Sequence, residues 1–179
     1  MRVVAGRLGG RRLIAPAGQS TRPTSDKVRE ALFSILGDVE GARVLDLFAG
    51  SGALGIEALS RGAARATFVD SAPAAVRAVR ENVAALGLED AAEVRRQDAR
   101  AFLRTAKKSG HEYDLVFLDP PYRLAAGLGR EISPLLSRVL GSQARVVWES
   151  DRRDAPALEL PTIDERRYGD TLIRIHVTE

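Results

Sequence analysis

The stretch Tyr113-Asp114-Leu115-Val116-Phe117-Leu118-Asp119-Pro120-Pro121-Tyr122 decides how this chain is organised. Residues 113–118 are a short apolar run bounded by polar residues, which predicts a buried strand. Two consecutive prolines cannot continue a sheet, so the strand is predicted to stop there with the Asp119 carboxylate at its end. Ligands of open α/β sheets bind at the carboxyl ends of the strands. The stretch therefore presents an acid, two rigid backbone carbonyls and an aromatic ring, a set suited to a planar base with an exocyclic amine.

The rest of the chain alternates predicted strands and helices. A first helix is expected from a Thr24 or Ser25 cap to Gly37, and its polar residues Thr24, Lys27 and Arg29 are candidates to face a ligand. The alternation that follows predicts an α/β fold with a mostly parallel, twisted sheet and helices on both faces, and two closing strands predict an antiparallel edge. The expected strands are 44–48, 66–70, 92–96, 114–118, 144–149, 157–168 and 171–178. Of the later helices, the first is expected to end near residue 60, and the others are expected at 73–86, 99–108 and roughly 128–140.

Composition places the chain among soluble globular proteins. Its 179 residues predict one domain, with 45% apolar and 28% charged residues. No cysteine is present, which excludes disulfides and thiolate metal sites, and two histidines are too few to suggest a metal site. The sequence shows neither a signal peptide nor a membrane-spanning apolar run, so we expect a cytoplasmic protein without metal or membrane partner.

The first 25 residues carry positive charge and no acid. Two extended pieces, 2–5 and 11–15, flank a glycine-rich loop and predict a β-hairpin. We expect residues 1–22 to form a nucleic-acid-binding extension and residues 23–179 to form the main domain, since a one-signed segment favours a polyanion. The alternative is that these arginines reflect overall composition, because the chain is rich in arginine and has only three lysines. The candidate contacts are Arg2, Arg7, Arg11, Arg12 and Arg22.

The segment 46–55 joins the first strand of the alternating region to its helix. Gly50, Gly52 and Gly55 match G-x-G-x-x-G, in which glycines allow a tight turn and close backbone approach to a ligand. Asp70 ends the next strand, where a carboxylate can take both ribose hydroxyls. The pattern fits a dinucleotide as well as S-adenosylmethionine, and a loop that only turns the chain is the alternative.

Two acids favour the methyl donor S-adenosylmethionine over a dinucleotide. Asp46 lies in the strand before the loop, near where a cationic amino-acid moiety can lie, and a pyrophosphate gains nothing from its charge. Asp98 follows the third strand and either accepts from an adenine amine or only caps the next helix. The candidate cofactor contacts are Asp46, Phe48, Ala49, Gly50, Gly52, Asp70, Ser71, Asp98 and Ala99.

Together, the glycine loop, the acid ending the second strand and Asp-Pro-Pro-Tyr resemble the Rossmann-like class I methyltransferases that modify exocyclic amines. The chain is more closely similar to the RsmD family of 16S ribosomal RNA guanine-N2 methyltransferases. The matching residues also include 2–6, 10–13, many of 22–33, 45–55 and 57–63. It departs at Leu8 and Gly9, where the family often has an aromatic residue, and at Asp70, where Glu is common.

The resemblance implies S-adenosylmethionine-dependent methylation of a guanine N2 amine in 16S rRNA. The implied catalytic residues are Asp119 and Pro120, which accept hydrogen bonds from the amine, Pro121, which fixes the turn, and Tyr122, which stacks on the base. The implied partner is 16S rRNA or an assembling small subunit, and we expect a monomer.

Other functions remain open at this point. Asp-Pro-Pro-Tyr does not separate guanine N2 of 16S rRNA from another RNA guanine or from adenine N6 in DNA. An NAD-dependent oxidoreductase shares the glycine loop, but the chain lacks a Tyr-x-x-x-Lys motif or a suitably placed histidine. A non-catalytic RNA-binding module is the last alternative.

Overall fold

The computed structural model describes residues 1–18, 24–106, 112–151 and 158–179, except for the side chains of residues 122–126. These residues form one seven-stranded sheet in the order β3-β2-β1-β4-β5-β7-β6. The first five strands pair in parallel, and β7 pairs antiparallel with β5 and β6, which confirms the predicted antiparallel edge. The strands are β1 Arg43–Leu47, β2 Arg65–Asp70, β3 Ala92–Arg96, β4 Tyr113–Leu118, β5 Leu140–Asp151, β6 Thr162–Tyr168 and β7 Thr171–Val177.

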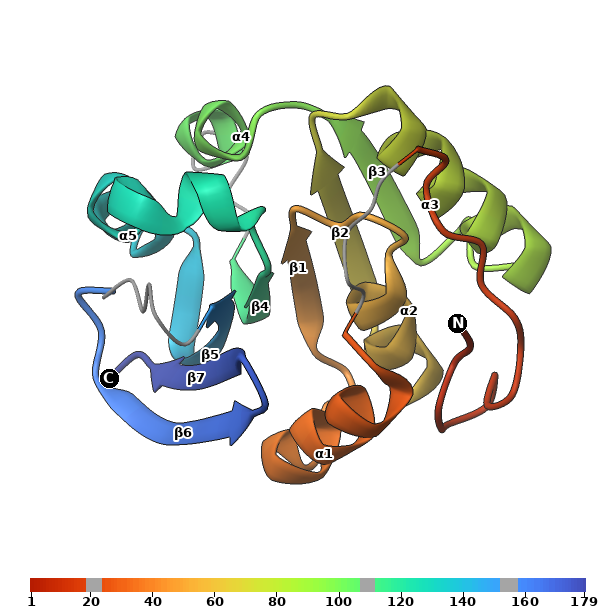
Figure 1. Ribbon diagram of the computed structural model, residues 1–179, viewed down its shortest axis with the longest axis horizontal. Coiled ribbons are helices and arrows are strands. Elements are labelled where there is room, and N and C mark those ends of the chain that lie inside the picture. The colour runs from red at the N-terminus through yellow and green to blue at the C-terminus, as the bar shows by residue number, and fades with distance from the viewer. Residues whose placement is uncertain (19–23, 107–111, 152–157) are drawn as a thin grey trace.

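Helices cover both faces of the sheet, as the alternating pattern predicted (Figure 1). One apolar core lies against α1 (Asp26–Leu36), α2 (Ala53–Ser60) and α3 (Pro73–Leu86). The other lies against α4 (Ala99–Ala106) and α5 (Tyr122–Leu136). Alternate strand residues feed the two cores: in β4, Phe117 joins the first and Leu118 the second. None of the helices described is long and apolar enough to cross a bilayer.

The main correction to the predicted elements concerns α5. It begins at Tyr122, directly after the two prolines, and ends at Leu136, whereas the sequence analysis placed a helix at roughly 128–140. Pro121 occupies the N-cap with extended geometry, a position that leaves no helical hydrogen bond to lose, and Pro134 is accommodated in the last turn. β5 is also longer than predicted, because Leu140 pairs with Tyr113 of β4 at its start and β7 pairs with it as far as Asp151 at its end.

The N-terminal segment, defined here as residues 1–18, is less regular than the predicted hairpin. Its only described bridge joins Arg2 to Arg12, with further backbone bonds from Val3 N to Arg11 O (2.9 Å) and from Leu13 N to Met1 O (3.0 Å). Pairing stops because the amides of the next residues have other partners, in α2. Three of its side chains, Val3, Leu8 and Leu13, are buried in the core beside α1, α2 and α3. The segment is therefore part of the domain's packing, and the predicted boundary at residue 22 lies outside the described residues.

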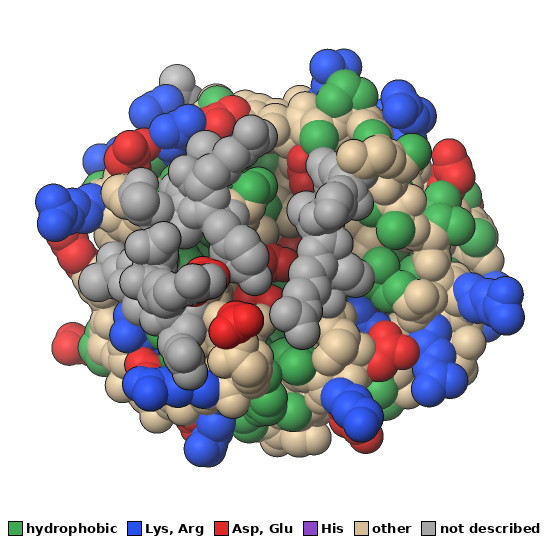
Figure 2. Space-filling model, in the orientation of Figure 1, with side chains coloured by type: hydrophobic (Ala, Val, Ile, Leu, Met, Phe, Trp, Pro, Cys, Tyr) green, Lys and Arg blue, Asp and Glu red, His purple; other side chains and the backbone are tan. Residues whose placement is uncertain are grey.

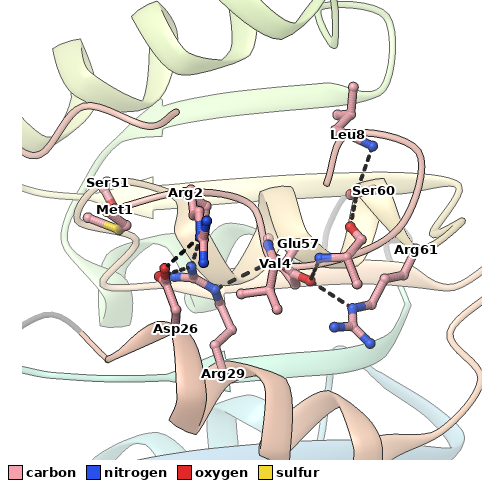
Figure 3. A network of polar contacts seen from close by, with 12 residues as sticks. Met1, Arg2, Val4, Leu8, Asp26, Arg29, Ser51, Glu57, Ser60 and Arg61 are labelled. Atoms are coloured by element: carbon pink, nitrogen blue, oxygen red, sulfur yellow. Dashed lines mark hydrogen bonds and ion pairs between the residues drawn. The ribbon is translucent and has the colours of Figure 1, made fainter. Parts of the chain in front are cut away.

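The Glu57 carboxylate of α2 ties this segment down (Figure 3). It accepts from the backbone amides of Val4 (2.7 Å) and Ala5 (2.9 Å) and pairs with Arg61 (2.8 Å) and Arg29 (3.6 Å). Its side chain is fully buried. Because a buried carboxylate is stable only when its oxygens are paired, Glu57 and the N-terminal segment hold each other in place.

Replacing Glu57 with alanine should lower the free energy of unfolding by about 3–5 kcal/mol, because two amides then lose a buried acceptor and the Arg29 guanidinium loses a buried ion-pair partner. Urea denaturation measures the loss, and hydrogen exchange should quicken first at Val4 and Ala5. Glu30→Ala, at an exposed position of α1, is the matched control. Equal stabilities of the two variants would contradict this role.

Candidate active site

The glycine loop between β1 and α2 has an unusual backbone. Phe48, Gly50 and Gly52 have positive φ angles of 65°, 57° and 79°, and Gly52 is the N-cap of α2. A side chain at Gly50 would meet no atom within 4 Å, so the loop backbone is open on that side. A positive φ at a phenylalanine costs of order 1–3 kcal/mol and is typical of functional loops.

Two predicted cofactor residues hold this loop through backbone amides. The Asp70 carboxylate accepts from Gly50 N (3.0 Å) and from Ala72 N (2.9 Å), and Asp46 accepts from Gly55 N (3.0 Å). Asp46 is 2% exposed, and burial raises its pKa to about 8, against the lowering effect of the Gly55 hydrogen bond and with a further rise from Asp70. The loop therefore has a fixed shape with two carboxyl groups beside it.

Four carboxylates lie on one face of the sheet at its carboxyl edge. Since side chains alternate along a strand, Asp46, Asp70 and Asp119 project toward the α1, α2 and α3 side, like Val44, Phe68 and Phe117 two residues before each of them. Glu149 follows Val147 in the same way. In the space-filling view, acidic side chains gather near the middle of the visible face, and Lys and Arg lie mostly around its rim (Figure 2).

Asp119 lies where the sequence predicted, just beyond β4, and is partly exposed. Its pKa is raised well above the usual range, first by desolvation and then by the charges of Glu149 and Asp46. Pro120 is buried beside it, and exposed Pro121 begins the turn into α5. Tyr122 starts that helix, but its side chain lies outside the described residues, so its stacking role stays a prediction.

Sequence reasoning missed Glu149. The carboxylate is 6% exposed and accepts a 2.6 Å hydrogen bond from the Thr24 hydroxyl, which comes from just before α1. Burial raises the pKa of Glu149, and the Thr24 bond opposes that rise. A strand ending in Trp148-Glu149 after an apolar run was the available signal, since the analogous Leu118-Asp119 had been recognised on β4.

The structure corrects the suggestion that Arg29 faces a ligand. Arg29 is fully buried, donates to Asp26 Oδ1 (2.9 Å) and to the Arg2 carbonyl, and pairs with Glu57. Lys27 is exposed on α1. Ser25, the predicted alternative to Thr24, caps α1 by accepting from Val28 N.

The remaining predicted cofactor residues lie at the ends of β2 and β3. Ser71 is exposed after β2 and Ala99 is buried at the start of α4. Asp98 caps α4 by accepting from Arg100 N (3.0 Å) and Ala101 N (3.1 Å), and its pKa is lowered because these bonds and the Arg100 guanidinium outweigh its desolvation. The capping role is thus observed, and the adenine contact stays a prediction.

The predicted RNA-binding arginines differ in whether their side chains already have bonding partners in the protein. Arg2 pairs with Asp26 (3.3 Å), and Arg11 donates to the Ala85 carbonyl (2.9 Å). Arg7 and Arg12 are exposed and form no ion pair with the residues that the structure describes. Arg22 lies outside them.

The four carboxylates at the carboxyl edge suit a ligand that carries positive charge. Within the described ranges, none of the four carboxylates forms an ion pair with Lys, Arg or His. Also within those ranges, no group of three or more His, Asp or Glu is arranged to hold a metal ion. A phosphate would be repelled, whereas a sulfonium and an ammonium group would be attracted and would offset the cost of burying Asp46.

Asp46→Asn should stabilise the ligand-free protein more at pH 8 than at pH 5. The folded-state pKa of Asp46, about 8, exceeds the unfolded value of 3.8, so the folded protein loses stability as pH rises through that window. Asparagine mimics the protonated form and still accepts from Gly55. Thermal melts across pH test this, with Asp90→Asn at an exposed position as control; parallel stability curves for the Asp46 variant and wild type would contradict it.

Comparison with known proteins places the chain among methyltransferases. The family model "Conserved hypothetical protein 95" matches residues 1–177. The chain is 50% identical to "Putative rRNA methyltransferase YlbH" of Bacillus subtilis (strain 168), over 90% of this chain and 86% of that protein. It is 39% identical to "Ribosomal RNA small subunit methyltransferase D" of Escherichia coli (strain K12), over 91% of this chain and 79% of that one.

Among solved structures, "Putative methyltransferase yhhF" from Escherichia coli matches with a TM-score of 0.85 at 36% identity, covering 100% of this chain and 98% of that chain. This confirms the predicted class I methyltransferase fold. On the family model and these relatives together, the chain belongs to the RsmD family, that of ribosomal RNA small subunit methyltransferase D.

Proposed function

We propose that the protein methylates the exocyclic N2 amine of a guanine in 16S rRNA, with S-adenosylmethionine as methyl donor. The observation that carries the proposal is the Asp119 carboxylate at the end of β4, beside the glycine loop that follows β1. β1 and β4 are neighbours in register up to Leu47 and Leu118, so Phe48 of the loop and Asp119 follow at the same level. A group held at the loop and a base held at Asp119 are therefore neighbours, as transfer of one carbon requires.

The protein's own groups account for binding the methyl donor. Asp70 binds the ribose hydroxyls through the lone pairs that its two amide bonds leave, and Asp46 beneath the loop ionises when a cationic ligand offsets the cost of its burial. When bound, S-adenosylmethionine supplies an electrophilic methyl group on a positively charged sulfur. Ser71, Asp98 and Ala99 line the expected adenosine side beyond β2 and β3.

The base is held by the residues that end β4. The lone pair of a guanine amine is delocalised into the ring, so the amine is a poor nucleophile until hydrogen bonds orient it. Asp119 and the Pro120 carbonyl accept from the two N–H groups, which turns the lone pair toward the methyl group and favours developing positive charge on nitrogen. Pro121 fixes the turn, and Tyr122 stacks on the base.

RNA binding has to offset the cost of unstacking the target base, roughly a few kcal/mol. The exposed arginines of residues 1–18, together with Arg22, supply contacts to the RNA backbone for this purpose. The family relatives named for the small ribosomal subunit support 16S rRNA as the substrate. Adenine N6 in DNA or another RNA guanine remains the competing target for the same Asp-Pro-Pro-Tyr site.

The deciding experiment is transfer of a tritiated methyl group to 30S subunits, naked 16S rRNA and DNA, followed by nucleoside analysis. We expect N2-methylguanosine in ribosomal RNA. Asp119→Ala should lose transfer while keeping the dissociation constant for S-adenosylmethionine within about tenfold of wild type, because its contacts are made to the reacting base. Label in adenine, or near-normal turnover by the variant, would refute the proposal.

The double substitution Arg7→Ala, Arg12→Ala should weaken RNA binding without changing S-adenosylmethionine affinity. Each phosphate that the protein no longer neutralises should reduce the slope of log K against log salt by about 1. Fluorescence anisotropy over a range of salt concentrations measures both effects. Arg166→Ala, Arg167→Ala on edge strand β6 is the control pair, and an equal effect of the two pairs would show that charge alone, not this segment, binds RNA.

A further inference from the structure

Glu149 is a buried carboxylate beside the proposed active site, and the proposed methyl transfer assigns it no role. Leu118 pairs with Trp148 in the parallel register of β4 and β5, so Asp119 and Glu149 follow at the same level of adjacent strands. Neighbouring strands lie about 5 Å apart, and both side chains project from the same face of the sheet. The two carboxylates are therefore direct neighbours.

Thr24 keeps Glu149 at this position. Its hydroxyl donates to Glu149 Oε2 at 2.6 Å across 125 residues of sequence, from the residue that precedes the α1 cap. A donor to a carboxylate stabilises the charged form, and the pKa of Glu149 is correspondingly held back from the rise that its burial causes. Glu149 is thus the better stabilised of the two charges.

The other described charged groups that act on Asp119 are also acids. Asp46 adds its charge from β1, and Asp70 acts on Asp46 from β2. No described cation faces the pair. A like charge on a neighbouring strand makes each carboxylate a stronger base. The pKa of Asp119 is accordingly raised, first by desolvation and then by the charges of Glu149 and Asp46.

We propose that Glu149, held by the Thr24 hydroxyl, is a positioning residue that acts through Asp119: its charge strengthens Asp119 as acceptor of the proton that the methylated amine loses. The inference rests on the proposed function. In this step the amine lone pair forms the N–CH₃ bond, the C–S bond breaks with its electron pair staying on sulfur, and an N–H proton passes to Asp119. Asp119 is partly exposed and returns that proton to water.

A direct test titrates Asp119 in the ligand-free protein by carboxyl-carbon NMR. Glu149→Gln keeps the shape and an acceptor for Thr24 but removes the charge, so the Asp119 titration midpoint should move to lower pH by about one unit. Glu30→Gln, an exposed substitution on α1, should leave it unchanged. An unmoved midpoint in Glu149→Gln would overturn the inference, whatever the enzyme methylates.

Kinetics supply the second test. In Glu149→Gln, kcat should fall about tenfold, the acid limb of its pH profile should move to lower pH, and KM for RNA should stay within about twofold. Thr24→Val should lower kcat in the same direction by less, and Thr24→Ser, which keeps the hydroxyl, should restore it. Unchanged kcat in Glu149→Gln, or a loss in Thr24→Val that serine does not restore, would assign Thr24 and Glu149 a packing role only.

Each of the two proposals can be refuted without refuting the other. Wild-type transfer to the three nucleic acids decides which amine is methylated. The shift of the Asp119 midpoint between wild type and Glu149→Gln needs no substrate and decides the role of Glu149 alone.

Discussion

A cluster of four carboxyl groups on one face of a parallel sheet is the constraint around which this protein is arranged. Parallel register sets the ends of β1, β2, β4 and β5 side by side, and strand alternation turns Asp46, Asp70, Asp119 and Glu149 to the same side. Backbone amides and one hydroxyl satisfy three of them, but no described cation neutralises any. The ligand-free protein therefore bears an electrostatic cost that a cationic ligand relieves, a common trade of stability for function.

The N-terminal segment is joined to the same site by buried polar side chains. Glu57 holds the amides of Val4 and Ala5, and Asn82 of α3 bonds both Ile14 and the Ser51 carbonyl of the glycine loop. Gly6 approaches α2 so closely that a side chain there would overlap the Ser60 carbonyl. Segments proposed to bind RNA and to bind the methyl donor thus share supporting residues, which explains why a sequence-defined appendage packs as part of the domain.

Much of the site was predictable because its signals are local. Glycines with positive φ, an acid closing an apolar strand and a double proline each act through their own backbone, so Gly50, Gly52, Asp70 and Asp119 were placed correctly at the carboxyl edge. α5 was misplaced because Pro134 left the start of that helix undefined, whereas the helix begins directly after the double proline and contains Pro134. The length of the hairpin was overestimated because the amides of Val4 and Ala5 donate to the Glu57 carboxylate, more than fifty residues away, instead of to the opposite strand.

By itself, the sequence determined the βαβ alternation, the glycine loop and the acids that end its strands, since periodicity and turn chemistry depend on near neighbours. Only the tertiary structure decided that Arg29 supports the fold instead of facing a ligand, and that Thr24 reaches Glu149 beside Asp119. Those contacts join residues from 27 to 125 positions apart, and no local pattern specifies which distant side chain fills a buried partner's lone pair.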